Sequence, residues 1–138
     1  MKYVDLGLTS GTRWADTNRE WCNARDISTK LIPTRAQFEE LFRECEVEMC
    51  EEGARLTGKT GNSIVLPIEA YGVPVFDLRH PADDPKKPRE YRAEHNGKGY
   101  YRTKDWKDNH NIVFWFNEQK FGALMSENTY KFSIRTAK

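Results

Sequence analysis

Three histidines and the aspartates near them are the side chains of this 138-residue chain that could bind a transition metal or transfer a proton. His80, His95 and His110 all fall in polar stretches, and Asp83 and Asp84 follow the first of them closely. Imidazole and carboxylate groups bind zinc when their spacing brings several ligands together. No such spacing is present in the sequence. We therefore interpret the histidines as exposed loop residues and expect no metal site.

Three cysteines, Cys22, Cys45 and Cys50, are the candidate nucleophiles. Their odd number does not suit a secreted disulfide scaffold, and no pair has the spacing of a zinc knuckle. Cys45 falls on the apolar side of an expected helix, where a thiol usually serves as a small apolar group. No serine or cysteine is flanked by a nucleophile elbow or an evident base. The sequence favours reduced thiols and a non-catalytic protein without a cofactor.

Arginine and aromatic residues gather between residues 79 and 106. Arginine, tyrosine and tryptophan carry much of the binding energy at protein interfaces, and aromatic rings also stack on sugar rings. Acidic residues lie among them, and the chain as a whole has 22 basic and 21 acidic residues. That balance does not favour nucleic acid as a partner. We predict a surface for a protein or carbohydrate ligand, formed by the 79–92 loop and including Arg79, Arg89, Tyr91, Arg92, Tyr100, Tyr101, Arg102 and Trp106.

One helix must lie early in the chain. Thr34 can cap its first turn, and Gln37 completes the sequence pattern of a capping box. Phe38, Leu41 and Phe42 then recur with Cys45 at the spacing of one apolar helix face. A second helix at 17–25 would be weakly patterned.

The rest of the sequence predicts strands on either side of one long loop. Alternating or β-branched runs predict strands at 3–8, within 46–68, at 99–103, at 111–117, at 121–125 and at 129–136. Residues 104–110 form a polar turn in this interpretation. Residues 72–98 contain four prolines and many charges, which predicts an irregular loop. We expect a single α+β domain over 1–138, with one or two helices against a mainly antiparallel sheet and with the strand at 3–8 paired to the strand at 129–136.

Several phrases of the sequence resemble a known family. The chain contains YVDLGLTSGTRWADTN, IPTRAQFEELFREC, GNSIVLP, GYYRT and FSIRTAK in that order. These phrases are similar to those of the Fibrobacter succinogenes major paralogous domain family, which is abundant in Bacteroidota. That family resembles C-type lectin-like domains.

The resemblance implies a C-type lectin-like fold in which Leu6, Leu8 and Trp14 belong to the core. It also implies that 72–98 occupies the long loop region, where ligands of this fold commonly bind. The calcium-binding tripeptides of sugar-binding members are missing. Phe116-Asn117-Glu118 is only weakly similar to one of them.

The sequence leaves two functional classes open. The first is a recognition module that uses the long loop, and the second is a structural or assembly component such as a virion decoration, with a possible homo-oligomer. No apolar run is long enough to insert into a membrane, and the first residues lack the pattern of a secretory signal. Light scattering would help to distinguish the two classes.

Overall fold

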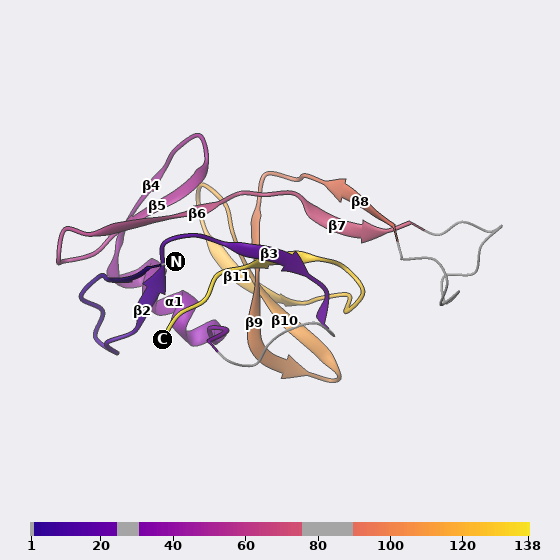
Figure 1. Ribbon diagram of the computed structural model, residues 1–138, viewed down its shortest axis with the longest axis horizontal. Coiled ribbons are helices and arrows are strands. Elements are labelled where there is room, and N and C mark those ends of the chain that lie inside the picture. Colours follow the sequence, from indigo (N-terminus) through magenta and orange to yellow (C-terminus); the bar gives the residue numbers. More distant parts are fainter. Residues whose placement is uncertain (1, 25–30, 76–89) are drawn as a thin grey trace.

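The computed structural model describes residues 2–24, 31–75 and 90–138. These residues form an α+β arrangement of mostly antiparallel sheet with one short helix, α1 (Arg35–Glu44) (Figure 1). This confirms the expected α+β class. The strands are β1 (Tyr3–Asp5), β2 (Arg13–Ala15), β3 (Arg19–Cys22), β4 (Glu46–Met49), β5 (Gly53–Thr57), β6 (Ser63–Pro67), β7 (Tyr71–Pro74), β8 (Tyr91–Glu94), β9 (Gly99–Lys107), β10 (His110–Phe116), β11 (Phe121–Met125) and β12 (Phe132–Ile134).

A five-stranded sheet in the order β11-β10-β9-β12-β3 carries the core. Its neighbours are antiparallel except for the parallel contact between β12 and β9. Helix α1 packs on one face, where the ring of Phe38 stacks 4.9 Å from the ring of Phe114. Leu6, Leu8 and Trp14 are buried in the same cluster, as the family resemblance implied.

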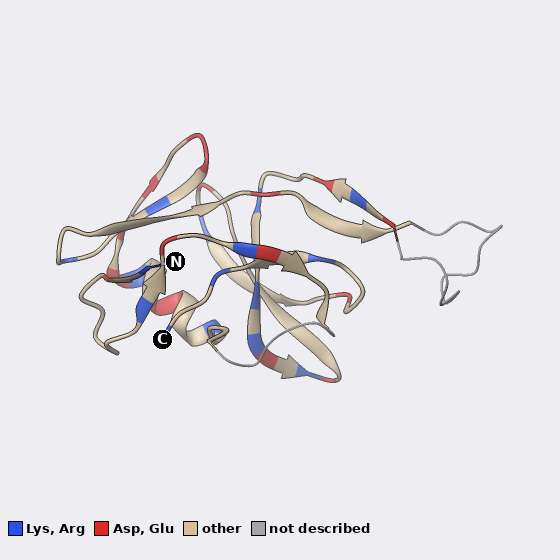
Figure 2. Cartoon of the chain, in the orientation of Figure 1, with Lys and Arg blue, Asp and Glu red and all other residues tan. Residues whose placement is uncertain are grey.

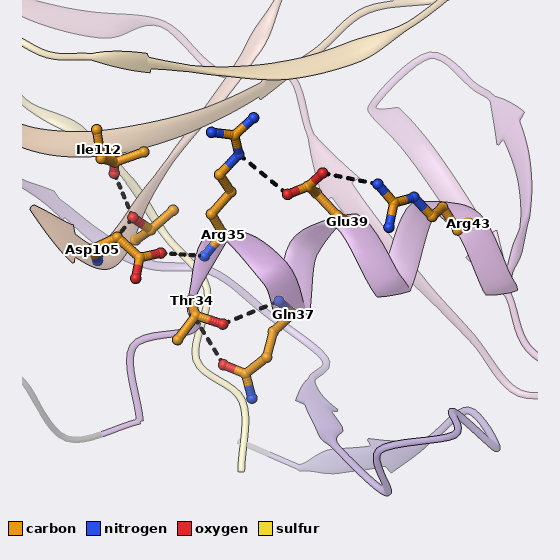
Figure 3. Close-up of polar contacts among 8 residues, drawn as sticks. Thr34, Arg35, Gln37, Glu39, Arg43, Asp105 and Ile112 are labelled. Carbon is orange, nitrogen blue, oxygen red and sulfur yellow. Dashed lines mark hydrogen bonds and ion pairs between the residues drawn. The ribbon is translucent and has the colours of Figure 1, made fainter. Parts of the chain in front are cut away.

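Helix α1 begins as its sequence predicts. The Thr34 side chain accepts a hydrogen bond from the Gln37 backbone, and the Gln37 side chain accepts one from the Thr34 backbone (Figure 3). The next backbone N–H, that of Arg35, donates to Asp105 at 2.6 Å. Asp105 comes from β9, so a bulged strand of the main sheet supplies part of the cap.

Strands β4, β5 and β6 form a separate antiparallel meander, which confirms the expectation for 46–68. The free edge of β6 is closed by side chains of the main sheet. Arg135 donates to the carbonyl of Val65 at 2.5 Å, and the Tyr101 hydroxyl donates to the carbonyl of Pro67 at 2.7 Å. These two bonds join the small sheet to the large one.

The expected pairing of the strand at 3–8 with the strand at 129–136 is wrong. Strand β1 pairs with β2, because the turn through Thr9, Ser10 and Gly11 returns the chain beside it, with Gly11 at a φ of +78°. The last residues then pair with β2 from its other side, where Trp14 lies opposite Ala137. The two ends of the chain still meet, since Tyr3 and Thr136 share a hydrogen bond of 2.9 Å between their hydroxyls.

Three other expectations need correction. In the described part of the segment 17–25, Arg19–Cys22 forms strand β3 in place of the expected helix, because these residues pair with β12. The ends of the expected 72–98 loop form a two-stranded ribbon, β7–β8, in which Gly72 lies opposite Ala93. The polar turn at 104–110 is shorter than expected, since β9 runs to Lys107 and the chain reverses through Asp108 and Asn109 at positive φ.

Candidate ligand-binding surface

The residues predicted to bind a ligand do not form one surface. Arg79 and Arg89 lie outside the described residues. Tyr91 and Arg92 lie on β8, and Tyr100 lies at the start of β9. Tyr91 and Arg92 lie opposite Pro74 and Val73 in the β7–β8 ribbon, and the Tyr100 ring lies 5.3 Å from that of Tyr71, the first residue of β7.

Tyr101 and Arg102 are fully buried and therefore do not belong to an exposed contact surface, which corrects the sequence prediction. Tyr101 faces α1, with its ring 5.9 Å from that of Phe38, and its hydroxyl accepts a hydrogen bond from Asn18 at 3.0 Å. Burial raises the pKa of the Tyr101 phenol far above its usual range. Arg102 points to the opposite face of the sheet, because neighbouring side chains of a strand alternate.

Trp106 is exposed, with 52% of its surface accessible, but it lies near the other end of β9. Trp106 is six positions along the strand from Tyr100, which corresponds to roughly 20 Å. Trp106 therefore does not share a contact surface with Tyr91, Arg92 and Tyr100.

Three half-buried tyrosines form the most distinctive surface feature at the base of the ribbon, and we call Tyr71, Tyr100 and Tyr130 the tyrosine cluster. The Tyr71 ring packs edge-on against Tyr100 at 5.3 Å and stacks with Tyr130 at 6.2 Å. All three rings lie against the buried Phe132, at 5.5 to 6.2 Å. Tilted and stacked rings at these separations stabilise one another.

A buried arginine supports the tyrosine cluster from beneath. The guanidinium of Arg102 lies 4.9 Å from the Phe132 ring and donates to the Tyr130 carbonyl at 2.6 Å. It also donates to Asn111 at 3.0 Å and to Ser126 at 2.8 Å. Burial lowers the pKa of this guanidinium to about 10. Arg102 thus holds Phe132 and the backbone of Tyr130 in place beneath the tyrosine cluster.

Polar groups surround the tyrosine cluster. Asn96 donates to the Tyr100 hydroxyl at 2.7 Å, and Arg92 pairs with Glu94 at 2.6 Å on the exposed side of β8. Burial raises the pKa of the Tyr71 phenol, and the neighbouring Tyr100 and Glu94 raise it further. Tyr71 therefore presents a neutral hydroxyl at physiological pH.

The charges around this surface are mixed. Figure 2 shows basic and acidic segments side by side on β8 and again on β3. Next to the cluster, the ammonium group of Lys131 lies 4.3 Å from the Tyr91 ring. On β10, Trp115 lies opposite Tyr100 and carries Lys98 at 4.6 Å from its ring. Aromatic area combined with charges of both signs suits a ligand that offers apolar faces together with hydrogen-bonding groups.

Within residues 2–24, 31–75 and 90–138, no group of three or more His, Cys, Asp or Glu side chains is arranged to hold a metal ion. Cys45 is buried on the α1 side of the core. Burial, followed by the nearby Glu44 and Glu40, raises the pKa of its thiol to about 11, so it stays protonated at neutral pH. No helix in the described part of the chain has both the length and the apolar character to cross a membrane.

Sequence reasoning missed Tyr71, Tyr130 and Trp115. Tyr130 begins the alternating run near residue 138, a pattern that predicts a strand face and no contact site. Tyr71 comes just before the predicted loop. The signal that could have found the two tyrosines is their place at the ends of apolar runs, where a ring is half covered.

Comparison of the chain with family models, with curated proteins and with solved structures finds no match.

Proposed function

We propose that this protein is a non-catalytic binding module whose ligand, a protein or a carbohydrate, contacts the tyrosine cluster at the base of the β7–β8 ribbon. The observation that supports this proposal is the arrangement of Tyr71, Tyr100 and Tyr130 around Phe132, held from beneath by Arg102. Rings fixed in this way lose little conformational freedom when a ligand binds, so more of the contact energy appears as affinity.

The scaffold we propose is C-type lectin-like, on the sequence resemblance to the Fibrobacter succinogenes major paralogous domain family. In that fold the segment joining β7 to β8 would correspond to the long loop region that commonly contacts ligands. The tyrosine cluster lies at the foot of the same ribbon. Both considerations point to recognition at this end of the molecule.

Binding to a glycan array and to a protein array tests the proposal. Changing Tyr71 or Tyr100 to Ala should weaken binding of the ligand so found by about 5- to 30-fold, which corresponds to 1–2 kcal/mol. Trp106→Ala is the matched control, because Trp106 is a large exposed aromatic of the same strand outside the cluster. Thermal unfolding of each variant checks that the fold is kept.

Two results would contradict the proposal. One is binding that survives both tyrosine substitutions and is lost in Trp106→Ala. The other is a properly folded wild-type protein that binds nothing on either array.

A further inference from the structure

Strand β11 is an edge of the five-stranded sheet, and β10 is the only strand among the described residues that pairs with it. Its sequence, Phe121–Met125, is FGALM, which contains neither a charge nor a proline. Leu124 and Met125 are exposed, with 36% and 52% of their surfaces accessible. An uncharged apolar edge strand is a template for pairing with another strand.

The hydrogen-bonding pattern shows which backbone groups of β11 face outward. Ser126 donates to the Asn111 carbonyl, and Asn117 donates to the Lys120 carbonyl, so these opposed pairs bond across the β10–β11 ladder. Such pairs alternate with unbonded ones in an antiparallel ladder. The N–H and C=O groups of Phe121, Ala123 and Met125 therefore point away from β10.

The other long edges of the described structure are protected. Strand β3 carries Arg19 and Glu20, and strand β4 carries Glu46 and Glu48, charges that discourage pairing. The edge of β6 is closed by the hydrogen bonds from Arg135 and Tyr101. Strand β11 has neither form of protection.

We propose that β11 pairs with β11 of a second copy of this chain, antiparallel, to form one continuous sheet across a two-fold axis. Symmetric pairing centred on Ala123 places Phe121 opposite Met125 of the second copy, and all the outward N–H and C=O groups of these residues then find partners. This surface shares no residue with the tyrosine cluster, so the inference is independent of the proposed function.

Charge at the two ends of β11 favours this direction of pairing. Lys120 precedes the strand and Glu127 follows it, and both are exposed. Antiparallel pairing brings Lys120 of each copy to the end of the ladder that holds Glu127 of the other copy. Parallel pairing would instead place like charges beside each other, which is unfavourable. The occupant that best complements this edge is therefore the edge itself.

Light scattering after size-exclusion chromatography tests the proposal across a dilution series. The wild-type chain should reach twice its monomer mass of 16.1 kDa as concentration rises. Ala123→Pro should remain a monomer, because it removes the outward N–H at the two-fold axis while sparing the bonds to β10. Met125→Lys, a milder change, should weaken the dimer by placing a charge on the edge. Val47→Lys is its control, since Val47 is 44% exposed on the edge strand β4.

Amide hydrogen exchange gives a second readout. Exchange of the Phe121, Ala123 and Met125 amides should slow as the concentration of the wild-type chain rises, and it should stay fast in a folded Ala123→Pro variant. A wild-type chain that is monomeric at every concentration overturns the proposal. This holds even if β11 is then found to pair with a different protein. A dimer that persists in both β11 variants overturns it as well.

Discussion

Arg102 is the residue whose chemistry differs most from what its position in the sequence indicated. It lies among basic and aromatic residues that suggested an exposed contact site, yet it is fully buried. Its hydrogen bonds in the described structure go to neutral acceptors, namely Asn111, Ser126 and backbone carbonyls. A buried cation of this kind is tolerated only while all those bonds are kept.

Arg102→Lys should therefore lower the free energy of unfolding by about 2–3 kcal/mol, since one ammonium cannot replace the planar fork of a guanidinium. Urea unfolding of the variant beside the wild type measures the change. Arg92→Lys is the control, because Arg92 is exposed on β8 and should change stability little. Equal stability of Arg102→Lys and the wild type would show that the buried network is dispensable.

At the scale of elements, the bulge in β9 links the main sheet to helix α1. Asn111 fills the irregular part of the β9–β10 ladder by donating to the carbonyls of Thr103 and Asp105. Asp105 is thereby turned toward the first turn of α1, where it accepts from the Arg35 N–H (Figure 3). A carboxylate at this position also interacts favourably with the helix dipole.

Asp105→Ala should cost about 1 kcal/mol of stability, because it leaves the first turn of α1 without this acceptor. Asp105→Asn keeps an oxygen acceptor without the charge and should recover part of the loss. Thermal unfolding of the two variants separates these contributions. If Asp105→Ala melted at the same temperature as the wild type, the hydrogen bond between the bulge and the helix would contribute nothing to the stability of the fold.

The whole molecule shows which features of the fold can be predicted from the sequence. Helix α1 was predictable because Thr34 and Gln37 signal its start locally and Phe38 and Leu41 repeat at the helical period. Strands β6, β10 and β11 were also predictable, because their residue types are likewise a local signal. Sheet order was not, because pairing depends on residues far apart in the chain.

Arg135 illustrates that limit for the fold. Simple alternation along 129–136 predicts its side chain on the polar face, but Arg135 directly follows β12, and residues 132–136 are all buried. The candidate site was predictable only in part for a similar reason. Tyr91, Arg92 and Tyr100 were found from local composition, whereas Tyr71 and Tyr130 join them only through the docking of Gly72 on Lys131.

The measurement that tests the central claim most directly is an NMR titration of the folded chain with the ligand identified on the arrays. The account predicts that the largest chemical-shift changes fall on the tyrosine cluster, namely Tyr71, Tyr100 and Tyr130. Changes should also appear on the ribbon strands β7 and β8 beside it. Changes concentrated around Trp106 at the far end of β9, with the tyrosine cluster unaffected, would contradict the claim.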